Sequence, residues 1–380
     1  MNIAVNTRLL LSNKLEGIGW FTYETLSRIT RRHPEHRFFF LFDRPYSEEF
    51  IFSGNITPVV VGPQARHPLL WYLWFEWSVP AVLKKHKAGL FISPDGYLSL
   101  KTGIPSLPVI HDLNFEHYPR HMPFLVRKYY KTFFPKFARK ALRIATVSEF
   151  SKQDIIKNYG IDSGIIDVVY NGVNEIYETV SEEKKQKTRD KYSGGVPFFL
   201  FTGSMLPRKN IAGIFLSFDR FRKSHSKDIK LLMVGEKKWW TKEIQDAYKN
   251  MQYKNEVIFM PHLSPDELKN IIPSALAMVY VSYFEGFGIP ILEAMRCGTP
   301  VITSDITSMP EVAGDAALLV NPFSVDSIAA AMLKIANDEG LRKQLIANGL
   351  ERSNDFSWQK TADRLWGCVE KTLESVKEKQ

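Results

Sequence analysis

The segment SYFEGFGIPILEAMRCGTPVI, residues 282–302, continues the apolar run AMVYVS at 277–282. Two glycines flank Phe287 and let the backbone approach a ligand closely, and Pro290 suits the first turn of a helix. Gly298 suits the end of that helix, and another apolar run follows it. The segment therefore predicts a strand, a glycine-rich loop, a helix and a second strand, which is the repeating unit of a parallel α/β sheet.

The same alternation of apolar runs and helical patterns extends outward in both directions. Runs without alternating polar residues are typical of parallel strands covered on both faces. The predicted strands are NIAVNT, RFFFLF, TPVVVG, GLFISP, LPVIHD, RIATVS and DVVYNG in the first half, and PFFLFTG, KLLMVG, VIFMPH, AMVYVS, PVITS and ALLVNP in the second. The tail FSWQKTADRLWGCVEKTLESVKEK predicts an amphipathic helix that by its period can pack on either half. We expect two doubly wound α/β domains.

Length and charge divide the chain in a similar way. A chain of 380 residues predicts about two domains, and the polar, helix-prone stretch 178–191 places the expected boundary near 174–195. Residues 1–173 hold 22 Lys and Arg against 14 Asp and Glu, whereas the rest holds 28 against 27. The basic first half suggests an acidic lipid surface, a phosphorylated substrate or nucleic acid as partner, with a solvated basic face as the alternative.

Composition excludes several classes of protein. The two cysteines, Cys297 and Cys368, are far apart and offer neither a CxxC pair nor metal-ligand spacing, so no metal site is expected. No apolar stretch of about 18 residues occurs, so no membrane span is expected. The start, MNIAVNTRLLL, lacks the pattern of a secretion signal, which indicates a cytoplasmic protein.

Two carboxylates stand eight residues apart, Glu285 in the glycine-rich loop and Glu293 in the expected first turn of the following helix. Carboxylates accept hydrogen bonds from hydroxyls, which suits a sugar or a ribose. The N–H groups of the loop and of the helix N-terminus favour phosphate. Taken alone, Glu293 can merely favour the helix N-terminus and Glu285 can be solvated.

The whole segment resembles the signature of retaining glycosyltransferases of family 4, which have the GT-B fold. That signature is a Glu-x7-Glu motif inside the frame E-G-F-G-x-P-x-x-E-A-M-x-x-G-x-P-V, and this chain matches it throughout. Other family-like positions follow the family order, so the resemblance covers nearly the whole chain; they are Gly17, Gly19, His111, Gly203, Arg208 and Lys209. Several relatives carry an arginine where this chain has Ser204, which places more weight on Lys209 than on Arg208.

The resemblance implies two Rossmann-like doubly wound domains that face each other across a cleft. It implies an acceptor-binding domain over 1–175, a nucleotide-sugar-binding domain over 176–355, and a C-terminal helix at 356–380 that packs back on the first domain. The catalytic residues that it implies are His111, which contacts the transferred sugar, and Glu285, which positions that sugar.

The implied donor is a nucleoside-diphosphate sugar, with no separate cofactor and no metal. The basic pair after Gly203 would grip the diphosphate, and Glu293 would bind the ribose. The residues implied to bind the donor are Gly17, Gly19, Gly203, Arg208, Lys209, Gly286, Phe287, Gly288 and Glu293. The family retains the anomeric configuration, which implies a front-face route. The expected donor sugar is mannose, from GDP-mannose, by similarity to hexosyltransferases of bacterial surface polysaccharide.

The acceptor is expected to be a glycan or a lipid-linked sugar. Trp71, Trp74 and Trp77 fall within an arc of about 120° on a helix, which is typical of a core face. Basic and aromatic residues interleave over 124–143, which suits an anionic membrane interface on the inner face of the cytoplasmic membrane. A core-packed helix with a basic surface is the alternative, and no nucleic-acid partner is expected.

Three other functions compete with glycosyl transfer. Gly17-x-Gly19 followed by a strand ending in Asp43 resembles a dinucleotide-binding pattern of oxidoreductases, but Thr22 stands where the third glycine belongs. An epimerase on the same architecture would use a nucleotide sugar without an acceptor, whereas the Glu-x7-Glu frame favours transfer. A nucleic-acid-binding protein would need stacking aromatics among basic residues, which the stretch 124–143 resembles.

Overall fold

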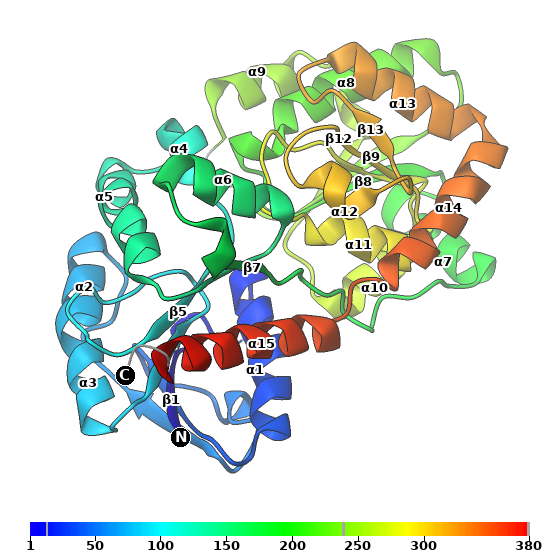
Figure 1. The fold of residues 1–380 in the computed structure, drawn as a ribbon. Coiled ribbons are helices and arrows are strands. Elements are labelled where there is room, and N and C mark those ends of the chain that lie inside the picture. Colours follow the sequence, from blue (N-terminus) through cyan, green and yellow to red (C-terminus); the bar gives the residue numbers. More distant parts are fainter. Residues whose placement is uncertain (13, 238–239, 378–380) are drawn as a thin grey trace. The chain divides into compact units, whose positions relative to one another are not determined.

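The computed structural model describes residues 1–12, 14–237 and 240–377, and the chain divides into two compact units (Figure 1). Unit 1 holds Met1–Gly172 and the C-terminal helix that starts at Trp358, and unit 2 holds Val173–Ser357. The polar stretch expected to contain the boundary forms α7 (Glu182–Ser193), which packs on α10 (Pro265–Ser274) inside unit 2. The chain therefore changes units just before that stretch.

Unit 1 is built on a parallel sheet of seven strands in the order β3-β2-β1-β4-β5-β6-β7. The strands are β1 (Asn2–Asn6), β2 (Arg37–Phe42), β3 (Ile56–Val60), β4 (Leu90–Ser93), β5 (Ser106–Ile110), β6 (Ile144–Thr146) and β7 (Ile166–Val168). The helices are α1 (Gly17–Arg32), α2 (Pro68–Leu73), α3 (Val79–Lys85), α4 (Asn114–His117), α5 (Phe124–Lys140), α6 (Glu149–Tyr159) and α15 (Trp358–Lys377). The strand order reverses between β1 and β4, which is where ligands of such sheets bind.

Unit 2 repeats this plan with six parallel strands in the order β10-β9-β8-β11-β12-β13. The strands are β8 (Phe198–Thr202), β9 (Lys230–Val234), β10 (Val257–Met260), β11 (Ala277–Tyr280), β12 (Val301–Ser304) and β13 (Leu318–Val320). Besides α7 and α10, the helices are α8 (Ile211–Ser224), α9 (Lys242–Lys249), α11 (Ile289–Arg296), α12 (Met309–Ala313), α13 (Val325–Asn337) and α14 (Glu339–Ser353). Here the order reverses between β8 and β11.

The apolar runs of the sequence form these strands because helices cover both faces of each sheet. Every residue of β4, β5, β8 and β11 is buried, which is why these segments lack the alternation of a half-exposed strand. The prediction of two doubly wound α/β halves is therefore confirmed.

The C-terminal helix α15 packs on α1, β5 and β6, all within unit 1. The Trp366 ring stacks on the His33 ring with 3.6 Å between centroids. Lys371 pairs with Asp167 at 2.7 Å, and the Thr361 hydroxyl donates to the Tyr170 carbonyl at 2.8 Å. Aromatic, ionic and hydrogen-bond contacts thus hold α15 against the rest of unit 1.

The expected tryptophan stripe is only partly a core face. Trp74 is fully buried and Trp71 is half-buried, whereas Trp77 is 61% exposed. The reason is a π-helical turn over Trp74–Ser78, which holds more residues per turn than an α-helix. The prediction from α-helical spacing was therefore wrong for Trp77.

Candidate active site

The family-like residues of unit 2 lie at the point where its strand order reverses. The segment 203–210 follows β8, and the loop that holds Glu285 follows β11, the strand beside β8 in the sheet. Parallel strands place their carboxyl ends on the same edge, so the two segments meet there. Residues more than 70 positions apart in sequence are thereby brought into contact.

Two cations converge on one carboxylate in this place. Arg208 Nη1 lies 2.9 Å and Lys209 Nζ lies 2.5 Å from Glu285 Oε1. The Arg208 guanidinium also donates to the Phe284 carbonyl at 3.0 Å, and the Tyr283 N–H donates to the Arg208 carbonyl at 2.9 Å. Backbone and side-chain bonds therefore hold the basic pair and the loop together.

The Glu285 carboxylate stays ionised although it is only 6% exposed. Burial raises its pKa, but the neighbouring Arg208 and Lys209 outweigh that effect and lower the pKa to about 2. The alternative in which Glu285 is simply solvated is wrong. The cluster combines one buried carboxylate with two cations, so it carries more positive than negative charge.

Tyr280 joins this cluster, and sequence reasoning missed it. Its side chain is buried at the end of β11, and its hydroxyl accepts a hydrogen bond from Lys209 Nζ and bonds to Glu285. Burial raises the pKa of the phenol well above its usual value, so the hydroxyl stays protonated. The sequence did contain one signal for Tyr280: it is a hydroxyl-bearing residue at the end of the strand that precedes the signature loop.

Contacts from Ser308 and Phe356 hold the glycine-rich loop in place. The Ser308 hydroxyl lies 2.9 Å from the Glu285 carbonyl and 3.0 Å from the Phe287 carbonyl. Gly288, immediately before α11, adopts a φ of 104°. Residues with a side chain rarely adopt this backbone conformation. Phe287 is buried against Phe356, with ring centroids 5.8 Å apart. The backbone that includes Gly286 is thus held in one conformation.

Glu293 is the fifth residue of α11, so it lies in the second turn of the helix and not in the first as expected. A hydrogen bond from the Tyr177 hydroxyl reaches its carboxylate. Burial raises the pKa of Glu293 to about 7, and the bond from Tyr177 only partly offsets this effect. Tyr177 was not predicted, because nothing in the sequence links it to a residue more than 100 positions later.

Gly203 and Gly235 follow neighbouring strands and differ in what surrounds them. Both have positive φ, 125° and 138°. A Cβ on Gly235 would lie 2.1 Å from the Gly203 carbonyl oxygen, whereas a Cβ on Gly203 would have no atom within 4 Å. Gly235 therefore serves backbone packing, whereas no neighbouring atom lies close to the Cβ position of Gly203.

His111 lies in unit 1, directly after β5. Its Nε2 donates to the Pro94 carbonyl at 2.7 Å, and its ring packs edge-on against Phe21 at 5.0 Å. Burial lowers the pKa of the imidazole, which is therefore neutral near pH 7. The Nδ1 of this tautomer is a hydrogen-bond acceptor.

The remaining family-like glycines belong to α1 and not to a loop before it. Gly17 is the first residue of that helix, and Gly19 is close to the Leu9 carbonyl, which a Cβ would approach to 3.0 Å. Asp43, the acid of the oxidoreductase alternative, is buried; it pairs with Arg44 at 2.6 Å and accepts from the Ala65 N–H. Its carboxylate serves the structure of unit 1.

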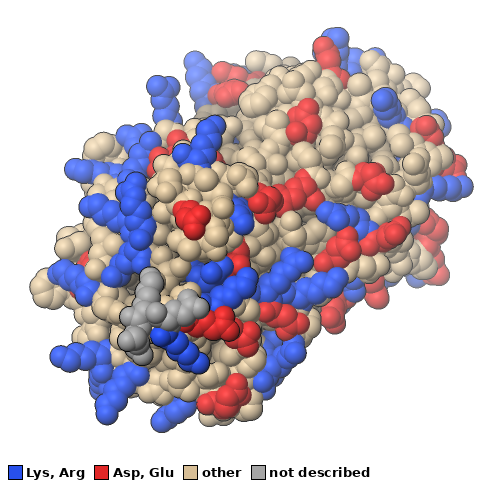
Figure 2. Space-filling view, in the orientation of Figure 1, with Lys and Arg blue, Asp and Glu red and all other residues tan. Residues whose placement is uncertain are grey.

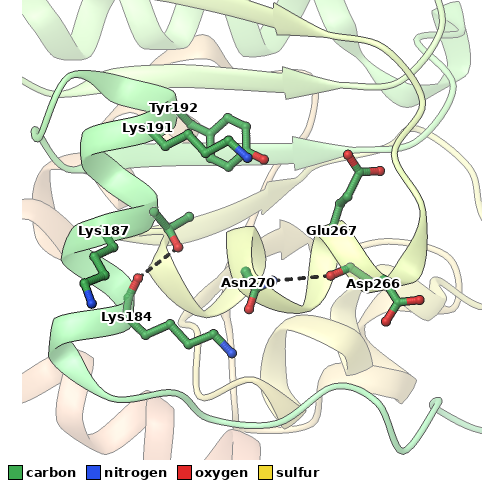
Figure 3. A pocket seen from close by; sticks show the side chains of 8 residues that line it. Lys184, Lys187, Lys191, Tyr192, Asp266, Glu267 and Asn270 are labelled. Carbon is green, nitrogen blue, oxygen red and sulfur yellow. Dashed lines mark hydrogen bonds between the residues drawn. The ribbon is translucent and has the colours of Figure 1, made fainter.

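A groove of about 290 Å³ lies between α7 and α10 (Figure 3). Lysines of α7 face carboxylates of α10 across it; the lining residues are Lys184, Lys187, Thr188, Lys191, Tyr192, Asp266, Glu267 and Asn270. None of the residues expected to bind the donor lines this groove.

In 1–12, 14–237 and 240–377, no three His, Cys, Asp or Glu side chains are grouped as a metal ion requires. In the same part of the chain, no helix combines the length and the apolar character needed to cross a bilayer.

Known solved structures share the fold of this chain. Sucrose-phosphate synthase from Thermosynechococcus elongatus matches with a TM-score of 0.79 at 17% identity, covering 98% of this chain and 99% of that one. HepE from Anabaena, solved in complex with UDP-glucose, matches with a TM-score of 0.74 at 16% identity, covering 98% and 100%. The expected GT-B fold is thereby confirmed.

Sequence relatives identify the family. Residues 15–175 match the model of the family Glycosyltransferase Family 4. Residues 181–352 match the model of the family Glycosyl transferases group 1. The chain is 28% identical to O-antigen chain mannosyltransferase B of Escherichia coli, over 78% of this chain and 76% of that protein. It is 32% identical to O-antigen chain mannosyltransferase RfbU of Salmonella typhimurium, over 76% and 78%. These relatives give no support to the epimerase or oxidoreductase alternatives, and the chain belongs to the family 4 glycosyltransferases with the GT-B fold.

Proposed function

We propose that this glycosyltransferase moves a hexose from a nucleoside-diphosphate sugar to a glycan or lipid-linked acceptor in cell-surface polysaccharide synthesis. The hexose that we propose is mannose. The observation that carries the proposal is the convergence of Arg208 and Lys209 on Glu285 at the strand reversal of unit 2. The names of the two O-antigen mannosyltransferase relatives support mannose and polysaccharide synthesis. The HepE structure with UDP-glucose supports a nucleotide-sugar donor.

Negative charge develops on the donor during transfer. The bond between the sugar C1 and the β-phosphate oxygen breaks, and its electron pair stays on that oxygen. In this proposal Arg208, Lys209 and the N–H groups at the start of α11 stabilise the departing diphosphate, and their positive charge takes the role that a metal ion has in other transferases. We therefore expect transfer without a metal.

The carboxylates and the imidazole bind neutral parts of the substrates. Ionised Glu285 accepts hydrogen bonds from hydroxyls of the transferred sugar, and Glu293 accepts from the ribose. Neutral His111 contacts the transferred sugar. The acceptor oxygen attacks C1 from the face that the diphosphate leaves, and its proton passes to the departing phosphate, so the anomeric configuration is retained.

The test of this function is incubation with GDP-mannose, UDP-glucose and other donors in the presence of EDTA and a lipid-linked oligosaccharide acceptor. We expect one donor to release its nucleoside diphosphate while the acceptor gains one hexose, with the donor's anomeric configuration in the product by NMR. An inverted product would contradict retention, and a strict need for added Mg²⁺ would contradict metal independence. Isomerised donor without released nucleoside diphosphate would instead support the epimerase.

We also propose that unit 1 binds anionic lipid at the inner face of the cytoplasmic membrane. The helices α2 and α5 pack together, with the Trp71 ring against the Tyr129 ring at 5.4 Å. Leu69, Leu73 and Trp77, spaced four apart, leave apolar side chains exposed on α2 and the turn after it, and Phe124 is 63% exposed at the start of α5.

Charge around these side chains suits an anionic surface. Residues 117–148 contain no Asp or Glu. Lys101 lies 3.7 Å from the centre of the Trp77 ring, and Lys140 donates to the Thr102 carbonyl at 2.7 Å, so the basic end of α5 joins the same surface. Figure 2 shows Lys and Arg side chains gathered over α5, α2 and α3. Exposed apolar groups among cations are typical of an interfacial helix.

Co-sedimentation with vesicles tests this surface. We expect binding to vesicles that contain phosphatidylglycerol, little binding to pure phosphatidylcholine, and weaker binding at high salt. Trp77→Ser and Phe124→Ser should reduce binding, whereas Leu216→Ser, at an exposed apolar residue of unit 2, should not. Equal loss in all three variants, or no binding at low salt, would contradict the proposal.

A further inference from the structure

Unit 1 holds a buried ion pair at its own strand reversal. Arg8 comes two residues after β1 and Asp95 two residues after β4, the strand beside it. Arg8 Nε lies 2.6 Å from Asp95 Oδ2, and the two side chains are 8% and 4% exposed. The guanidinium lies over the Tyr97 ring, 4.3 Å from its centre. Because desolvation offsets most of the attraction in a buried ion pair, such a pair is weak evidence of a role in stability alone.

The Asp95 carboxylate closes the turn that follows β4. Its Oδ1 accepts from Asn6 Nδ2 at 2.7 Å, from the Ser93 hydroxyl at 3.0 Å and from the Tyr97 N–H at 3.3 Å. Within the turn, the Gly96 N–H donates to the Ser93 carbonyl at 3.2 Å. The bonds within the turn fix the backbone between Ser93 and Tyr97, the bond from Asn6 holds the Asp95 side chain in place, and Pro94 lies inside that stretch.

The Pro94 carbonyl is the group that orients His111. His111 Nε2 lies 2.7 Å from it, and since a carbonyl oxygen only accepts, the proton of the neutral ring sits on Nε2. The edge-on Phe21 ring limits rotation of the imidazole. The position of the carbonyl therefore decides both the tautomer and the direction of Nδ1.

We propose that Arg8 and Asp95 are positioning residues for His111. The ion pair locks the turn, the turn places the Pro94 carbonyl, and the carbonyl presents Nδ1 as a hydrogen-bond acceptor for a hydroxyl of the reacting sugar or of the acceptor. This inference rests on the proposed role of His111 in transfer. It adds that Asp95 acts on His111 through the backbone and does not touch the substrate.

The first test reads the imidazole directly. The full chain, labelled with ¹⁵N in histidine and assigned with His111→Gln, is expected to show His111 as the Nε2–H tautomer. Asp95→Asn removes the charge and keeps the shape, and we expect it to shift the His111 nitrogen signals toward a tautomer mixture. Asp167→Asn is the control, because Asp167 pairs with Arg143 at 2.8 Å elsewhere in unit 1. Unchanged His111 signals in Asp95→Asn would overturn the proposal.

The second test uses turnover. We expect Asp95→Asn to lower kcat about 10- to 100-fold with the KM for the donor nearly unchanged, as for a misplaced reactive group, and Asp167→Asn to leave both constants near wild type. Equal loss in both variants would indicate a structural role only and contradict the proposal. A His111→Ala variant with normal kcat would refute the role of His111 in transfer, while the NMR result still decides whether Asp95 orients the ring.

Discussion

The two units share one strand plan but differ in the charge at the strand reversal. In unit 2 two cations, Arg208 and Lys209, face the single carboxylate of Glu285. In unit 1 one cation, Arg8, faces the single carboxylate of Asp95. The common sheet therefore sets only where side chains meet, and the residues just after the strands decide what can bind there.

This difference suits the two halves of a transfer reaction. A cluster with excess positive charge attracts a diphosphate, whereas a neutralised ion pair leaves no net charge for an anion and can act as a rigid support. We therefore propose that the donor binds to unit 2 and that the ion pair of unit 1 has a supporting role.

Removing the cation of the unit 1 pair is expected to have the largest effect. Arg8→Met leaves the Asp95 charge buried without its partner, so we expect a loss of about 3–5 kcal/mol in the free energy of unfolding. The control is Arg32→Met, because Arg32 pairs with Asp363 where both side chains are more than half exposed, and such pairs contribute at most about 1 kcal/mol. Urea unfolding measures both values, and equal losses would contradict the account.

Changing the unit 2 carboxylate is expected to separate turnover from binding. Glu285→Gln should lower kcat/KM about 100-fold, because the transferred sugar loses its positioning group. Affinity for a free nucleoside diphosphate should rise, since Arg208 and Lys209 no longer share their charge with a carboxylate. Glu267→Gln, at an exposed carboxylate of α10, serves as control. Calorimetric titration that finds weaker diphosphate binding in Glu285→Gln would count against this arrangement.

The two glycines at the unit 2 edge give a matched steric comparison. Gly235→Ala places a Cβ against the Gly203 carbonyl, so it should be about 1–3 kcal/mol more destabilising than Gly203→Ala, in which the Cβ meets open space. Gly203→Ala should instead weaken donor binding. Thermal unfolding measures the stability of the two variants, and donor titration measures their affinity for the donor. If Gly235→Ala weakened donor binding more than Gly203→Ala does, Gly203 would not belong to the donor site.

The smallest expected effect is the pH dependence that Glu293 adds to donor binding. Its pKa is raised from 4.5 to about 7, so the stability that it contributes is fully present below about 4.5 and is lost as the pH rises through about 7. Ionised Glu293 is the stronger acceptor for ribose hydroxyls, so donor affinity should rise by up to about tenfold between pH 6 and 7 and level off above pH 7.

Titration with the intact nucleotide sugar measures this dependence, because its diphosphate has no second ionisation in that range. Glu293→Gln should bind the donor with an affinity that hardly changes between pH 6 and 8. A pH dependence that persists unchanged in Glu293→Gln would show that another group titrates.

Most of the fold was predictable from the sequence, because parallel strands that are buried on both faces have continuous apolar sequences. The tryptophan stripe was less predictable, since the π-helical turn at Trp74–Ser78 changes the spacing without a local signal. The predicted boundary at 175/176 lies three residues from the division between Gly172 and Val173, whereas the polar stretch taken as a linker is the helix α7, which packs on α10.

The candidate site was predictable where its residues lie within one signature and not where they meet across the sheet. Glu285 and Lys209 were named from motifs. Tyr280, Tyr177 and the ion pair of Arg8 with Asp95, 87 positions apart, depend on contacts that only the folded sheets create.

We propose that the basic pair of unit 2, Arg208 and Lys209, binds the donor's diphosphate. The most direct measurement is calorimetric titration of wild type, Lys209→Met and Lys191→Met with GDP and UDP in EDTA. Lys191 is the control because it is a lysine of the same unit that lines the groove between α7 and α10. We predict at least tenfold weaker binding of the preferred nucleotide to Lys209→Met and unchanged binding to Lys191→Met; unchanged affinity in Lys209→Met, or its loss in Lys191→Met, would contradict the account.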